Sequence, residues 1–120
     1  TNYLKIHFLP VSMDFINDTQ ELQQHIDRKN AFFIFKHSTQ CPISAQAKEE
    51  FEKFVQEHKP EYVAVKVIEN RDISNSIEDI TGVKHQSPQA ILMQGNKVLW
   101  HDSHRNLTQE TFKEQWNNKK

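Results

Sequence analysis

The sequence contains a single cysteine, Cys41, so no disulfide can form within these 120 residues. This excludes the class of small secreted domains that are held together by disulfide bonds, and a reducing cytoplasm is the expected setting. The 2 glycines are too few for a phosphate-binding loop or a dinucleotide-binding fingerprint. Any disulfide that Cys41 forms must therefore join it to another molecule.

An excess of charge and long apolar runs are also absent. The 15 Lys and Arg residues nearly balance the 16 Asp and Glu residues. This balance argues against nucleic acid or a membrane surface as the main partner. No apolar stretch approaches the ~20 residues of a membrane-spanning helix, and no signal-peptide pattern is present. With few prolines and glycines to form linkers, residues 1–120 are expected to be a single domain.

Hydrophobic periodicity predicts an alternation of strands and helices. Strands are expected at 3–9, 31–35, 61–69, 90–94 and 97–100, and helices at 17–29, 42–58, 72–82 and 107–116. Apolar runs such as "AFFIF" suit strands that are buried on both faces. A strand–helix–strand unit with two such strands requires a parallel pair and a right-handed crossover. The predicted fold class is α/β, a central mixed β-sheet flanked by helices.

Cys41 lies between a buried strand and the longest predicted helix. Pro42 suits the first position of that helix, because its missing N–H would have no partner there. Cys41 would then be the N-cap residue, where unpaired N–H groups and the positive end of the helix dipole favour the thiolate. Such a setting lowers the pKa of a cysteine and makes it a nucleophile. The alternative is a free cysteine that only packs as a small apolar side chain.

Ser44 stands three residues after Cys41, where a redox dithiol would have its second cysteine. Its hydroxyl could donate a hydrogen bond to the sulfur, but it cannot resolve a mixed disulfide. A thiol adduct on Cys41 would therefore wait for a second, external thiol. Lys36 and His37 could add positive charge that favours the thiolate, although both also suit a solvated polar loop. One cysteine with scattered histidines lacks the paired spacings of a structural zinc site, and no metal is expected.

These features together resemble the thioredoxin fold, which has a C-x-x-S or C-x-x-C motif at a helix start and a proline before a later hairpin strand. The stretch "KHSTQCPIS" is similar to the T-C-P-I-S signature of the YtxJ-like monothiol bacilliredoxin family. This resemblance implies a thiol–disulfide oxidoreductase whose cysteine, here Cys41, removes bacillithiol from S-bacillithiolated client proteins under oxidative stress. Bacillithiol would be a co-substrate, and no bound cofactor is implied. The motif residues Pro42 and Ser44 would support the thiolate, as would His37.

The resemblance also implies a substrate-binding surface around the thiol. Ser87-Pro88 would match the loop that carries a cis proline opposite the cysteine. A cis bond would leave backbone groups of Gln86 and Ser87 free to pair with an extended substrate. Gln40 stands where the signature has threonine, so it would change the detail of thiol recognition.

Two other classes of function remain open at this stage. A glutaredoxin-like module could hold an iron–sulfur cluster together with a low-molecular-weight thiol, although Pro42 replaces the glycine found in those proteins. A non-catalytic stress protein on a thioredoxin scaffold would carry an inert thiol. The pKa of Cys41 separates this inert reading from a catalytic one, because an inert thiol would keep a value near or above about 8.5.

Overall fold

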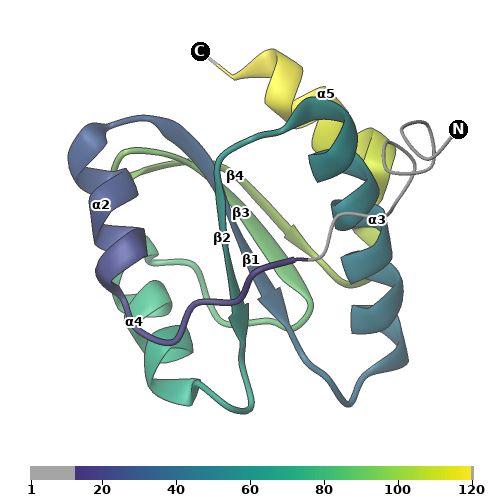
Figure 1. Ribbon diagram of the computed structural model, residues 1–120, viewed down its shortest axis with the longest axis horizontal. Helices are drawn as coiled ribbons and strands as arrows, with labels where there is room; N and C mark the ends of the chain where they lie inside the picture. Colours follow the sequence, from purple (N-terminus) through teal and green to yellow (C-terminus); the bar gives the residue numbers. More distant parts are fainter. Residues whose placement is uncertain (1–12, 120) are drawn as a thin grey trace, which may run out of the picture.

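The computed structural model describes residues 13–119, which form a mixed sheet with helices on both faces (Figure 1). The strand order is β2-β1-β3-β4, in which β1 and β2 are parallel and the other neighbours are antiparallel. The strands are β1 (Ala31–His37), β2 (Tyr62–Lys66), β3 (Gln89–Gln94) and β4 (Lys97–Ser103). The helices are α2 (Gln20–Arg28), α3 (Pro42–His58), α4 (Arg71–Thr81), α5 (Gln109–Asn118) and the short 3-10 helix η1 (His104–Asn106).

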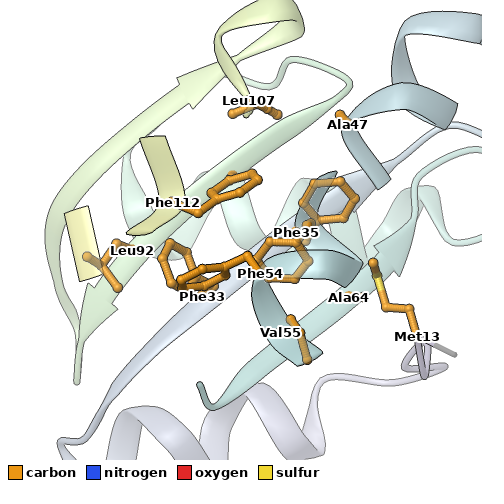
Figure 2. Close-up of a cluster of buried hydrophobic side chains, with 12 residues drawn as sticks. Met13, Phe33, Phe35, Ala47, Phe54, Val55, Ala64, Leu92, Leu107 and Phe112 are labelled. Carbon is orange, nitrogen blue, oxygen red and sulfur yellow. The ribbon is translucent and has the colours of Figure 1, made fainter. Parts of the chain in front are cut away.

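Strand β1 separates two hydrophobic clusters, because successive side chains of a strand point to opposite faces. Phe33 and Phe35 belong to the cluster beneath α3 and α5 (Figure 2). Phe32 and Ile34 belong to the cluster on the other face, which α2 and α4 cover (Figure 1). All four side chains are fully buried. The unbroken apolar run therefore marks a strand that is covered on both faces, as the sequence indicates.

Aromatic rings hold α3 against the sheet. The ring of Phe51 on α3 stacks on Phe35 at a centroid separation of 4.7 Å and meets Phe33 edge-on at 5.6 Å. Phe112 of α5 packs against Phe51 at 5.0 Å. Offset and edge-on pairs of this kind add to the stabilisation from burial. The cluster fixes the orientation of α3 and therefore the position of its first residue.

Helix α3 begins and ends where the sequence predicts, at residues 42 and 58. Pro42 stands at its first position and Cys41 is the N-cap. The helix ends at Lys59, which takes the left-handed conformation with φ of 50° and donates its N–H to the carbonyl of Val55. None of the helices within residues 13–119 combines the length and the apolar character needed to cross a membrane.

Other predicted elements are confirmed with small changes in their bounds. Strands β3 and β4 form the antiparallel hairpin expected around Gly95, which has φ of 58°. Gly82 ends α4 in the left-handed conformation with φ of 70°. Strand β2 is shorter than the predicted 61–69, because the chain turns after Lys66 toward α4. The strand predicted at 3–9 lies outside the described residues.

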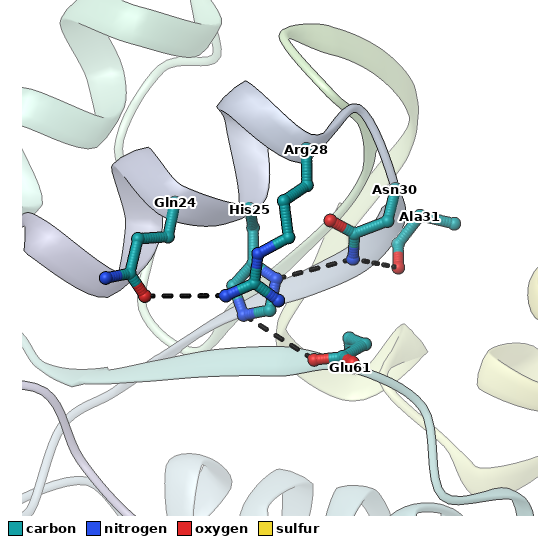
Figure 3. A network of polar contacts seen from close by, with 6 residues as sticks. All are labelled: Gln24, His25, Arg28, Asn30, Ala31 and Glu61. Carbon is teal, nitrogen blue, oxygen red and sulfur yellow. Dashed lines mark hydrogen bonds and ion pairs between the residues drawn. The ribbon is translucent and has the colours of Figure 1, made fainter.

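A polar network ties α2 to the starts of β1 and β2 (Figure 3). The His25 ring is almost fully buried and stacks on Phe32 at 4.9 Å. Its Nε2 lies 3.7 Å from a carboxylate oxygen of Glu61, and its Nδ1 lies 3.3 Å from the side-chain amide of Asn30. These contacts lie at the edge of the sheet where β1 and β2 begin, opposite the edge that carries Cys41.

Candidate active site around Cys41

Three loops meet at the edge where β1 and β2 end. Parallel strands have their carboxyl ends at the same edge, and His37 and Lys66 are register partners there. Strand β3 is antiparallel to β1 and begins at this edge, with Gln89 opposite Lys36. The N–H of Val67 donates to the carbonyl of His37 at 2.9 Å and fixes the loop after β2 beside β1. The loops after β1, after β2 and before β3 therefore surround a common space.

Cys41 caps α3 with an extended backbone, φ −117° and ψ 122°, and its side chain is partly exposed. Its carbonyl accepts the N–H of Ala45 at 3.1 Å, which is the first helical hydrogen bond. Its own N–H donates to the carbonyl of Ser38 at 3.4 Å. The sulfur is thus held at the helix N-terminus with access to solvent, where a nucleophile can meet a disulfide.

The pKa of the Cys41 thiol is lowered from its ordinary value. The largest cause is the backbone N–H of Ser44, and the N–H of Ile43 and the Ser44 hydroxyl also favour the thiolate. Partial desolvation opposes them by disfavouring the charged form. The donors are the unpaired N–H groups of the first helical turn, which stabilise the thiolate.

Ser44 is fully buried and joins the helix to the loop before it. Its hydroxyl oxygen accepts the N–H of Ser38 at 3.3 Å. A hydroxyl accepts through its lone pairs and donates through its single hydrogen, so the same group can also donate to the sulfur of Cys41. Ser44 therefore fixes the conformation of the thiol loop as well as favouring the thiolate.

The loop before β3 faces the thiol loop. The Ser87-Pro88 peptide bond is cis, as the resemblance implies. The Gln86 N–H lies 3.4 Å from the side-chain oxygen of Gln89, and the Pro88 carbonyl accepts the N–H of His104 at 3.0 Å. The Pro88 carbonyl and the Gln86 N–H are thus occupied within the fold. The pairing of this loop with substrate stays a prediction.

A pocket of about 240 Å³ opens beside the thiol. Cys41 and Ser38 of the thiol loop line it, together with Ser87 of the cis-proline loop. The remaining lining comes from the loop after β2, the first turns of α4 and the loop before β3: Val67, Ile68, Arg71, Ser74, Asn75 and His85. Cys41 therefore stands at the wall of a small recess that has both polar and apolar lining. Within residues 13–119, no three His, Cys, Asp or Glu side chains are grouped as metal ligands would be.

A protein-family model described as "Monothiol bacilliredoxin BrxC" matches residues 14–112. The match includes both the thiol loop and the cis-proline loop. The chain belongs to the monothiol bacilliredoxin family. Membership of this family and the fold make it a thiol oxidoreductase with a thioredoxin fold, which agrees with a thiolate-stabilising N-cap cysteine.

Solved structures place this bacilliredoxin among thioredoxin folds. A structure described as an oxidoreductase candidate with a thioredoxin fold is 31% identical, covers 84% of this chain and 90% of its own, and has a TM-score of 0.78. Thioredoxin from Trypanosoma brucei brucei has a TM-score of 0.73 at 13% identity, over 92% of this chain and 93% of its own. Fasciola hepatica thioredoxin has a TM-score of 0.72 at 14% identity, over 90% of this chain and 100% of its own. The two thioredoxins support the fold alone.

Two residues singled out in the bacilliredoxin sequence are placed differently from the others. Gln40 is exposed and does not line the pocket, so its part in thiol recognition stays a prediction. His37 is almost fully buried at the end of β1. Burial, followed by the charge of Lys48, lowers the pKa of His37 and so disfavours the charged ring. The support that His37 would give to the thiolate stays a prediction.

Helix α4 contributes residues to the site that the sequence does not predict. Arg71, Ser74 and Asn75 follow β2 and share the pocket wall with His85. The predicted parallel pair of strands could have pointed to these residues, because it puts the loop after the second strand beside the loop after the first. Their side chains carry no motif, and only the spatial arrangement brings them to the thiol.

Proposed function

We propose that this chain is a monothiol oxidoreductase that removes bacillithiol from S-bacillithiolated client proteins. The observation that carries the proposal is the state of Cys41, a partly exposed N-cap thiol whose pKa is lowered and which has no second cysteine in the chain. A dithiol enzyme resolves its mixed disulfide internally. This chain cannot, so the mixed disulfide is its working state.

The first step transfers bacillithiol from the client to Cys41. The Cys41 thiolate attacks the bacillithiol sulfur of the client mixed disulfide, and the client–bacillithiol S–S bond breaks. The electron pair leaves on the client sulfur, which takes a proton from solvent. The backbone N–H groups of Ile43 and Ser44 favour the attacking thiolate. The products are a reduced client and Cys41 in a disulfide with bacillithiol.

The second step uses bacillithiol as a co-substrate. A free bacillithiol thiolate attacks the bacillithiol sulfur bound to Cys41, releasing bacillithiol disulfide and regenerating the thiolate. Ser44 favours the thiolate but offers no thiol, so no competing internal disulfide forms. The cycle requires a reducing pool of small thiols, and we therefore place the protein in the cytoplasm.

Adduct transfer tests this function. The reduced protein is mixed with a client peptide carrying bacillithiol, and both partners are followed by intact mass spectrometry. The mass of bacillithiol should leave the peptide and appear on the protein, and Cys41→Ser should abolish the transfer. A control variant, Ser76→Ala, changes a residue of α4 that does not line the pocket and should transfer normally. If no mass moves, or if Cys41→Ser performs like the wild type, the proposal is wrong.

A further inference from the structure

We propose, on the basis of the function above, that the pocket beside Cys41 binds a carboxylate of the small thiol. Cys41 lines the pocket, so a small thiol joined to Cys41 in a disulfide has this pocket beside it. Its volume of about 240 Å³ is below the ~300–1,000 Å³ range of sites for drug-sized ligands. It therefore suits part of a small molecule rather than a segment of folded client.

The walls of the pocket are rich in donors and carry no carboxylate. Arg71 presents the only permanent positive charge among the lining side chains, and none of these residues is Asp or Glu. Arginine offers a planar set of donors that fits a carboxylate in bidentate fashion. The amide of Asn75 lies on the same helix face, one turn further along, and the hydroxyl of Ser74 beside it is paired with Nδ1 of His85 at 3.1 Å. An anionic group is the ligand that such a wall favours.

Two buried polar groups near the pocket have no hydrogen-bond partner among the described residues. The hydroxyl oxygen of Ser87, which lines the pocket, is one of them. The ammonium of Lys36 is the other, and its side chain is fully buried on the face of β1 that α4 covers. Buried polar groups are normally paired, so Ser87 at the pocket and Lys36 behind it each lack the partner that such groups usually have.

The charge of Lys36 reaches the pocket wall. It is close enough to His85 to lower the pKa of that ring, second only to the effect of burial. Glu78 of α4 offsets part of this charge, since it acts on both Lys36 and His85. The Glu78 carboxylate already accepts the N–H of His85 at 2.7 Å. Arg71 also lowers the pKa of His85, so two cations and one carboxylate act on this residue of the pocket wall.

A matched series of small disulfides tests this subsite. The symmetrical disulfides of cysteamine, 2-mercaptoethanol and 3-mercaptopropionate share a two-carbon arm and end in an ammonium, a hydroxyl and a carboxylate. The second-order rate of adduct formation on Cys41 is measured for each by mass spectrometry. The ratio of the carboxylate rate to the hydroxyl rate is the readout, because it cancels the intrinsic reactivity of the thiolate. Each rate is divided by the rate at which a small reference thiolate attacks the same disulfide, because thiols of lower pKa leave faster. After this normalisation we expect the carboxylate to react fastest and the ammonium slowest.

Arg71→Gln should lower the carboxylate-to-hydroxyl ratio by roughly tenfold, in line with the loss of one charge-assisted hydrogen bond. Arg28→Gln is the matched control, because Arg28 is an exposed arginine of α2 at the opposite edge of the sheet (Figure 3). It should leave the ratio unchanged, although it alters the net charge equally. An unchanged ratio in Arg71→Gln, or equal normalised rates for the three disulfides, overturns the subsite while leaving adduct chemistry intact. No adduct with any disulfide would instead overturn the proposed function.

Discussion

The buried amine of Lys36 offers a quantitative test of the structure. The side chain of Lys36 is fully buried, and its ammonium has no hydrogen-bond partner among the described residues. Desolvation lowers its pKa from the ordinary 10.5 to about 8, and Glu78 opposes this only in part. At about 1.36 kcal/mol for each pKa unit, keeping the amine charged costs the folded state about 3 kcal/mol. Replacing Lys36 by methionine, which has a similar length and no charge, should remove this cost.

The pH dependence follows from the sign of the shift. Below about pH 8 the amine is protonated in both the folded and the unfolded chain, so the full cost applies. Between about 8 and 10.5 the folded chain loses the proton that the unfolded chain keeps. The unfolded state then binds more protons, and the stability of the wild type rises with pH. The advantage of Lys36→Met should fall from about 3 kcal/mol at pH 7 to about 1 kcal/mol at pH 10.

Urea unfolding of both proteins between pH 7 and pH 10 measures this difference. Cys41 also favours folding as pH rises toward its unfolded pKa, and Tyr62, whose pKa is raised by burial, opposes folding above about pH 10. Both effects are common to the two proteins and cancel in the comparison. The reasoning is refuted if Lys36→Met is the less stable protein at pH 7, or if the difference does not change with pH.

Two further substitutions test the thiol loop and the core that positions it. Ser44→Ala should raise the pKa of Cys41, which is measured from the rate of alkylation as a function of pH. The rise should be smaller than the whole shift, because the larger contributions of the backbone N–H groups remain. An unchanged or lower pKa contradicts the role of the hydroxyl. Phe51→Ala should lower the free energy of unfolding by about 3–5 kcal/mol in urea, as expected for a fully buried ring in an aromatic cluster. A loss below about 1 kcal/mol would contradict the packing of α3 described here.

The sequence was sufficient for the elements whose signals are local. The bounds of α3 follow from Pro42 at its start and from the helical spacing of its apolar residues up to His58. The N-cap position of Cys41 follows from the same pattern. The two-sided burial of β1 follows from an unbroken apolar run, which has few other structural explanations. In each case the residues that decide the outcome are neighbours along the chain.

The sequence was insufficient where the outcome depends on residues far apart in the chain. His37 was expected to add charge, but its pKa depends on burial and on Lys48, which only the packed structure brings near. The recess beside the thiol needs Arg71 of α4, about thirty positions beyond Cys41. The cis conformation of the Ser87-Pro88 bond could be predicted only from the family resemblance, since isolated X–Pro bonds favour trans.

Lys36 connects the stability of the fold to the chemistry of the site. An unpaired ammonium in the core weakens the folded state, and an apolar side chain of similar volume fits the same space at lower cost. Groups that weaken the folded state are often found where function needs them, and removing such a group raises stability but lowers activity. Lys36→Met should therefore be more stable at pH 7 and yet show a lower carboxylate-to-hydroxyl ratio in the disulfide series. A variant that is more stable with an unchanged ratio would separate Lys36 from the anion subsite and leave Arg71 as its sole charged determinant.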